Sequence, residues 1–285
     1  MFEKKNLFYT SFAILAGWML IGIVGFFSQM GSSIALNKLV EEQITLSFII
    51  APLFLLSVVF LSKGSLKVGF NPPKSFKSLF HLWLPLLFIL AFLFTGISKG
   101  LPPNSVVVFI LINTLLVGVS EELMFRGILF GASLTKFPIW KSIWITSIVF
   151  GLIHLPNGFI TGDYTAASIQ ALQAVFAGVW FIAIRIRTGS IFPVIIIHGL
   201  WDFSIFIMSW GVEPTALQEQ SLISKFLPHL ILELPLFLYA MWLLRKVGKM
   251  DKIETLVKHS YLNKTKQQQF INLLNNRKAR LIEAL

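Results

Sequence analysis

The sequence contains no cysteine in 285 residues, so disulfide bonds and thiolate metal sites are excluded. Charged residues are also scarce. They make up 13% of the chain, whereas a soluble domain carries about 25%. Hydrophobic residues account for 55%. Together these proportions exclude an ordinary soluble enzyme and predict an all-α polytopic membrane protein.

Acidic residues are fewer than basic ones, 13 against 24, which gives a net charge of +11. Such a charge is found in nucleic-acid-binding proteins. In a membrane protein it is better explained by an excess of Lys and Arg in cytoplasmic connections and by attraction to anionic lipid headgroups. We therefore expect the lipid bilayer as a partner and no nucleic acid.

Long apolar runs predict about eight transmembrane helices. They occupy residues 7–30, 44–62, 79–97, 104–125, 138–155, 166–185, 191–210 and 223–244. Connections rich and poor in Lys and Arg alternate along the chain, which places both termini in the cytoplasm. Residues 1–244 form the expected membrane domain, and 245–285 a basic cytoplasmic tail. The start of the chain leads directly into an apolar run with no small-residue cleavage site, and predicts a retained first helix.

Three charges follow one another at the end of the fourth apolar run, in Glu121, Glu122 and Arg126. A charged residue in the middle of a span costs roughly 3 kcal/mol on insertion scales, so such residues are usually functional. Glu122 and Arg126 are four residues apart and are expected to form an ion pair on one helix face. Glu121 projects about 100° away from Glu122. The spacing therefore predicts one pinned carboxylate and one free carboxylate.

Two further patterns follow on later spans. Phe150 and His154 are one helical turn apart, and His198 and Asp202 are spaced to share a face. A free carboxylate can activate water as a general base, and the histidines and aspartate can hold water and stabilise an oxyanion, which suits hydrolysis. Glu121, His154, His198 and Asp202 also suit a divalent metal such as zinc with an open position for water. The residues leave both alternatives open.

Taken together, Glu-Glu-x-x-x-Arg, Phe-x-x-x-His and His-x-x-x-Asp resemble the CAAX-protease and bacteriocin-processing family (CPBP, also called Abi), which includes endopeptidases that trim prenylated CAAX proteins. The resemblance implies a catalytic core on the fourth to seventh spans, about 104–210. It also implies glutamate-activated hydrolysis, with Glu121 activating water and the Glu122–Arg126 pair supporting it. Asp202 stands where CAAX endopeptidases have Asn.

The predicted function is an intramembrane endopeptidase acting on a peptide or membrane-protein substrate, in the cell membrane of a bacterium because no eukaryotic processing signal is visible. In this scheme His154 holds the water or the leaving group, and His198 with Asp202 stabilises the oxyanion. One alternative is a catalytically idle membrane scaffold or a bacteriocin self-immunity protein. Another is a proton-coupled transporter. No repeat in the sequence favours transport.

Depth in the membrane conflicts with this scheme. A helix rises by about 1.5 Å per residue, so Glu121 should lie about 26 Å from the outer end of its span, near the cytoplasmic face. By the same rise His198 should lie about 10 Å from the inner end of its helix. His154 comes 13 residues after Lys141 and should lie about 20 Å from it along the helix. A displaced or tilted 138–155 helix, or a water-filled cavity reaching the middle of the membrane, would reconcile these depths. His81 and His229 are expected to form helix–helix hydrogen bonds. Glu233 either pairs with Arg185 or His229 or lines the cavity.

Overall fold

The computed structural model describes residues 6–30, 37–63, 66–211 and 222–247, and residues 268–269, 271–273 and 276 further on. Most of the predicted basic tail, 245–285, therefore lies outside the described residues. In the described part the secondary structure is helical and no strand occurs. The helices are α1 (Leu7–Met30), α2 (Lys38–Glu41), α3 (Leu46–Leu61), the 3₁₀ helix η1 (Phe76–Leu82), α4 (Trp83–Lys99), α5 (Asn104–Glu122), the π-helix η2 (Leu123–Leu129), α6 (Phe130–Leu134), α7 (Ile139–Leu152), α8 (Asn157–Thr161), α9 (Tyr164–Thr188), α10 (Phe192–Ser209) and α11 (Leu222–Leu244).

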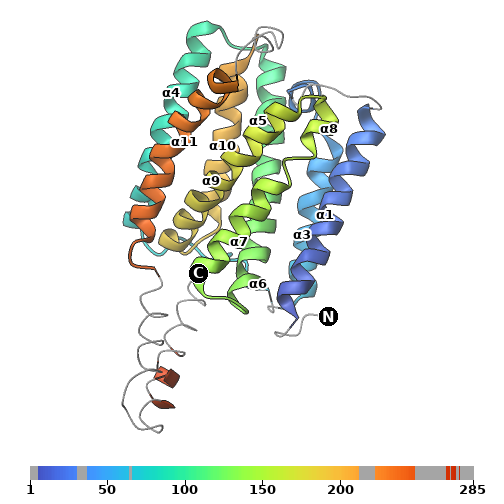
Figure 1. Cartoon of the computed structure of the whole chain (residues 1–285). Helices are drawn as coiled ribbons and strands as arrows, with labels where there is room; N and C mark the ends of the chain where they lie inside the picture. Colours follow the sequence, from blue (N-terminus) through green and yellow to red (C-terminus); the bar gives the residue numbers. More distant parts are fainter. Residues whose placement is uncertain are drawn as a thin grey trace.

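The long helices run up and down through one bundle, so that α1 begins and α11 ends at the same end of it (Figure 1). Seven helices of the described part are long and apolar enough to cross a membrane. The apolar α3 has 16 residues, or about 24 Å, against a hydrocarbon core of about 30 Å. The all-α polytopic fold is confirmed, and α3 supplies the short eighth helix of the predicted set.

Close backbone contacts hold the central helices in register. A Cβ atom added at Gly118 of α5 would lie 2.9 Å from Gly199 N and 2.9 Å from Ile195 O of α10. Likewise, a Cβ atom at Gly178 of α9 would lie 2.7 Å from the Ser147 Cα atom of α7. Small residues permit such approaches between helices in a membrane. Since Gly118 precedes Glu122 by one turn and Gly199 follows His198, the α5–α10 contact brings these two side chains together.

The fourth span is longer than the sequence predicted. It was expected at 104–125 but runs from Asn104 to Leu134, because α5 continues through η2 into α6. All seven residues of η2 are buried, Arg126 included. The charge at Arg126 therefore does not mark the end of the helix. This corrects the predicted depth of Glu121, which lies well inside its span and not near its end.

The fifth span is also organised differently from the prediction of one helix over 138–155. Helix α7 ends at Leu152, a turn follows, and α8 begins at Asn157. His154 lies in that turn. The interruption separates His154 from the regular helix and removes the assumption on which its predicted depth rested.

The connection after α1 is fixed to α5 by one buried side chain. Asn113 donates hydrogen bonds to Val40 O (3.1 Å) and Gln43 O (2.7 Å), and its Oδ1 accepts one from Thr45 N (3.0 Å). An amide side chain can satisfy loop carbonyls and amides in this way where no water is present. The segment from α2 to the start of α3 is consequently held over the interior of the bundle.

Candidate active site

Glu122 is the centre of a buried hydrogen-bonded cluster. Its side chain is fully buried, and Oε1 accepts hydrogen bonds from Arg126 Nη1 (2.9 Å) and from His198 Nδ1 (2.6 Å). The predicted Glu122–Arg126 pair is therefore present. The bond to His198 was not predicted, and it joins two motifs that are 76 residues apart. A buried carboxylate needs such partners because an unpaired charge in the interior is costly.

Aromatic rings enclose Arg126. Its guanidinium lies 4.0 Å from the ring centroid of Phe150 and 4.7 Å from that of Phe181. Phe181 also stacks on the His198 ring, with centroids 4.7 Å apart and planes inclined by 27°. Cation–π contacts stabilise a desolvated cation by about 2 kcal/mol or more. The two rings thus separate the Arg126 charge from the space in front of His198.

His198 presents its second ring nitrogen to two other carboxylates. Nε2 lies 3.7 Å from Glu121 Oε2 and 3.5 Å from Asp202 Oδ2. These side chains are partly exposed, 15% for Glu121 and 27% for Asp202. Both separations are longer than an ordinary hydrogen bond but still allow an ion pair when His198 is protonated. Glu121 is thus the free carboxylate of the pair, as its 100° offset from Glu122 predicted.

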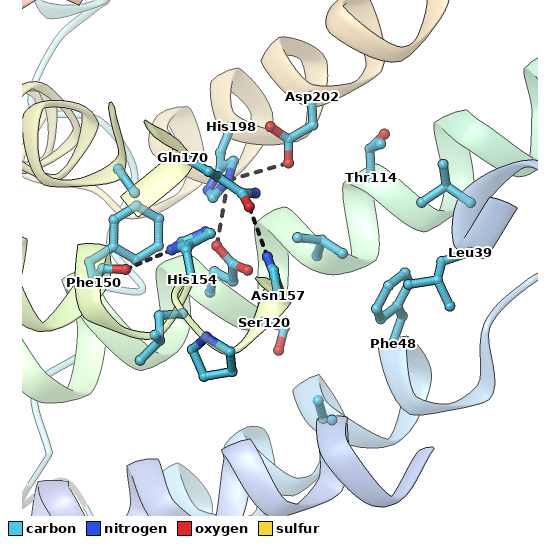
Figure 2. Close-up of a pocket in the computed structure, with 18 of the residues that line it drawn as sticks. Leu39, Phe48, Thr114, Ser120, Phe150, His154, Asn157, Gln170, His198 and Asp202 are labelled. Atoms are coloured by element: carbon cyan, nitrogen blue, oxygen red, sulfur yellow. Dashed lines mark hydrogen bonds and ion pairs between the residues drawn. The ribbon is translucent and has the colours of Figure 1, made fainter. Parts of the chain in front are cut away.

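A backbone contact orients His154. Nδ1 lies 2.8 Å from Phe150 O, and because a carbonyl oxygen can only accept, Nδ1 carries the proton. In the neutral ring Nε2 is then an acceptor. Figure 2 shows His154 and Asn157 facing the same pocket as His198 and Asp202. His154 is therefore placed to accept a hydrogen bond from a water or a substrate amide.

A cavity of about 510 Å³ connects these groups. Glu121, His154, His198 and Asp202 all line it, and so do residues of α1, α2 and α3 at its far side. Arg126 is not among its described lining residues. The four expected catalytic side chains are thus gathered at one cavity inside the bundle, and the depth conflict disappears.

Comparison with known proteins agrees with this arrangement. Residues 103–204 match the family model described as type II CAAX prenyl endopeptidase Rce1-like. This part of the chain is therefore similar to that endopeptidase family. No curated protein and no solved structure matches the chain. The matched residues include all six predicted site residues, and the matched family is described as one of endopeptidases.

Polar residues outside the predicted site set also line the cavity. Asn157 Nδ2 donates to Gln170 Oε1 (2.9 Å), and Gln173 follows one turn later on α9. Ser120 accepts a hydrogen bond from Trp18 Nε1 (2.6 Å). The sequence does carry a signal for Gln170 and Gln173, because two uncharged amides stand in an apolar span. They were not predicted because the site residues were chosen among ionisable side chains.

The metal alternative needs three or more ligands around one point. Among the residues that the structure describes, no group of three His, Asp or Glu side chains is arranged to hold a metal ion. His198 directs Nδ1 to Glu122 and has only Nε2 left for the cavity.

Proposed function

We propose that this protein is an intramembrane endopeptidase in which Glu121 activates a water molecule for attack on a peptide bond. The division of the glutamate pair is the observation that carries the proposal. Glu122 is fully buried and bonded to Arg126 and His198, whereas Glu121 reaches the cavity. A general base must lie within reach of the water that it deprotonates, and Glu121 meets this requirement.

The reaction proceeds in two steps that balance in protons. Glu121 accepts a proton from water while the water oxygen bonds to the scissile carbonyl carbon, which gives a tetrahedral oxyanion. Glu121 then returns that proton to the amide nitrogen, the C–N bond breaks, and a carboxylic acid and an amine leave. One carboxyl group serves as base and then as acid, which general acid–base catalysis permits.

The surrounding groups support these steps in distinct ways. His154 accepts a hydrogen bond from the attacking water through Nε2. In its doubly protonated form His198 donates from Nδ1 to Glu122 and from Nε2 to the oxyanion. A preorganised donor of this kind contributes about 3–4 kcal/mol to catalysis. Asp202, 3.5 Å from His198 Nε2, positions that ring.

The substrate is a peptide bond of a membrane-bound or membrane-inserted polypeptide. The cavity lies within the transmembrane bundle, and its lining is mostly apolar. Such a site admits an apolar chain from the bilayer and supplies the polar groups only at the reacting bond. Trimming of a prenylated C-terminus, the activity in the name of the matched family, is one substrate class that this cavity suits.

The test compares the membrane peptidomes of cells that express wild-type protein, Glu121→Gln or Glu42→Gln. Glu42 is an exposed carboxylate outside the cavity and serves as the matched control. We expect cleavage products that disappear with Glu121→Gln and persist with Glu42→Gln. A phenotype that is lost on deletion but retained by Glu121→Gln would refute catalysis and favour a scaffold role.

Metal dependence is tested on purified protein in nanodiscs. We expect cleavage of a product-derived peptide to continue after treatment with a strong chelator. Loss of cleavage that added zinc restores would replace the water-activating role of Glu121 by a metal site. The alternative ligands would then be Glu121, His154, His198 and Asp202.

A further inference from the structure

A second buried carboxylate lies on the cavity wall without a counter-ion among the described residues. Glu233 of α11 is 3% exposed, and its Oε2 atom has no hydrogen-bond partner among the described residues. No ion pair in the described part joins it to Arg185 or His229, the two partners that the sequence suggested. Instead it lines the cavity, which was the third possibility. A buried carboxylate without a counter-ion is costly and indicates a binding role.

Carboxylates outnumber cationic groups on the cavity wall, where His198 is the one lining residue of the described part that carries a positive charge in the proposed mechanism. Three carboxylates line it, from Glu121, Asp202 and Glu233, and no Lys or Arg is among its described lining residues. Arg126, the cation of the site, is bonded to Glu122 and covered by aromatic rings. These carboxylates stand in a chain whose net charge is +11. Carboxylate-lined clefts with apolar walls concentrate positive ligands.

An apolar pocket adjoins Glu233 and leads away from the catalytic groups. It measures about 260 Å³, and Gln173 and Glu233 line both it and the main cavity. Its other walls come from α9 and α11. They are six apolar residues and one histidine, namely Ile169, Leu172, Phe176, Phe226, Leu227, Leu230 and His229. A carboxylate at the border between two apolar spaces matches a side chain with an apolar stem and a cationic end.

We propose that Glu233 is a specificity-determining residue that binds the ammonium or guanidinium group of a Lys or Arg side chain in the peptide substrate. The methylene stem of that side chain lies along the apolar walls shared by the two pockets, and its charge satisfies the Glu233 carboxylate. The assignment rests on the proposed peptidase function and narrows its substrates to peptides with a basic residue near the scissile bond.

The binding energy is of the kind that separates substrates. A hydrogen bond to a charged group is stronger than one between neutral groups, and leaving a buried charge unpaired adds a further penalty. A substrate with norleucine in place of lysine fills the apolar walls equally well but leaves Glu233 unpaired. We therefore expect a preference of about 10- to 100-fold in kcat/KM for the lysine peptide over the norleucine peptide.

The experiment uses full-length protein in nanodiscs and two series of short, apolar, fluorescence-quenched peptides. In one series a single lysine moves through the sequence, and in the other norleucine takes its place. Wild-type protein, Glu233→Gln, Glu233→Arg and the exposed control Glu42→Gln are compared. We expect the wild type and Glu42→Gln to favour lysine at one position, Glu233→Gln to lose that preference, and Glu233→Arg to favour a glutamate peptide. Cleavage of norleucine peptides by Glu233→Gln should rise above the wild-type level, because the variant removes the charge that these peptides leave unpaired.

A binding measurement separates the two proposals. Peptide affinity is measured by tryptophan fluorescence on Glu121→Gln, with and without Glu233→Gln. If lysine peptides bind more tightly than norleucine peptides only when Glu233 is intact, the subsite is supported. If wild-type protein nevertheless cleaves no peptide, the peptidase function alone is refuted. Equal cleavage and equal binding of the two series by protein with intact Glu233 would overturn the subsite alone. A uniform loss of activity in Glu233→Gln for both series would assign Glu233 a structural role.

Discussion

Among the described residues, Arg126 and His198 are the two basic side chains bonded to Glu122, and replacing Arg126 by methionine removes the first of them. The change leaves Glu122 fully buried and bonded to His198 alone. Methionine fills much of the space between Phe150 and Phe181, and sulfur–aromatic contacts contribute about 0.3–1.5 kcal/mol. The variant therefore isolates the effect of losing the charge from that of opening a cavity.

The expected cost is large. Removing one partner of a buried ion pair costs about 3–5 kcal/mol, because the other charge stays buried without compensation. For a chain of this size a loss of 1 kcal/mol lowers Tm by about 2–4 °C, so we expect a decrease of about 6–20 °C. The double variant Glu122→Gln/Arg126→Met removes both charges and keeps an acceptor for His198 Nδ1. It should recover most of the loss, since neutral replacement of a buried pair is often nearly neutral.

The measurement is thermal unfolding of purified protein in detergent, followed by the fluorescence of its eight tryptophans. Thiol-reactive dyes are unsuitable because the chain has no cysteine. Lys141→Met provides the matched control. Lys141 is an exposed cation over the ring of Phe137, 4.5 Å from its centroid, and its loss should cost less than about 1 kcal/mol.

Two results would refute this reasoning. A Tm for Arg126→Met within the range of the Lys141→Met control would show that the Glu122–Arg126 pair contributes no stability. A double variant less stable than Arg126→Met would show that the two charges do not compensate one another. Either outcome would also remove the structural basis for separating Glu122 from Glu121.

Three other substitutions test the packing and the site. Asn113→Leu should destabilise the protein by about 3 kcal/mol, because it leaves three backbone groups of residues 40–45 without a hydrogen-bond partner. Amide hydrogen exchange of residues 40–45 should increase, and unchanged exchange would contradict this prediction. Gly118→Ala should cost about 1–3 kcal/mol in thermal unfolding because its Cβ would meet α10 backbone, whereas Gly22→Ala, with nothing within 4 Å of that Cβ, should change stability by less than about 1 kcal/mol. His154→Asn should lower kcat by about 10²- to 10³-fold with KM within a factor of two in steady-state assays, and an effect confined to KM would exclude its proposed role.

The sequence predicted the fold and the motifs because both depend on local spacing. Apolar runs identify membrane helices regardless of their partners. The four-residue intervals of Glu122 with Arg126 and of His198 with Asp202 place each pair on one helix face. The structure has both pairs, at 2.9 Å and 3.5 Å. The offset of Glu121 from Glu122 likewise predicted the division into a buried and a cavity-facing carboxylate.

The length of the fourth span and the bond between Glu122 and His198 could not be predicted in the same way. In the sequence, the charge of Arg126 marks the end of an apolar run. In the structure that charge is buried, and it is stabilised in part by the rings of Phe150 and Phe181 on later helices. The approach of α5 to α10 depends on two glycines meeting, and no local rule pairs Gly118 with Gly199. Contacts between distant segments decided both features.

The π-helix has a consequence for how this chain tolerates changes in length. A π segment contains i→i+5 hydrogen bonds, so it accommodates a residue that a regular α-helix would not. Deleting one residue within Leu123–Leu129 is therefore compatible with a continuous α-helix, but in such a helix each residue turns the chain by about 100°. The residues after the deletion would therefore be rotated about the helix axis relative to Glu122 and would contact different neighbours. A deletion among residues 127–129 keeps the spacing of Glu122 and Arg126, so it should yield a folded, membrane-inserted protein that retains this pair and repacks the helix after it.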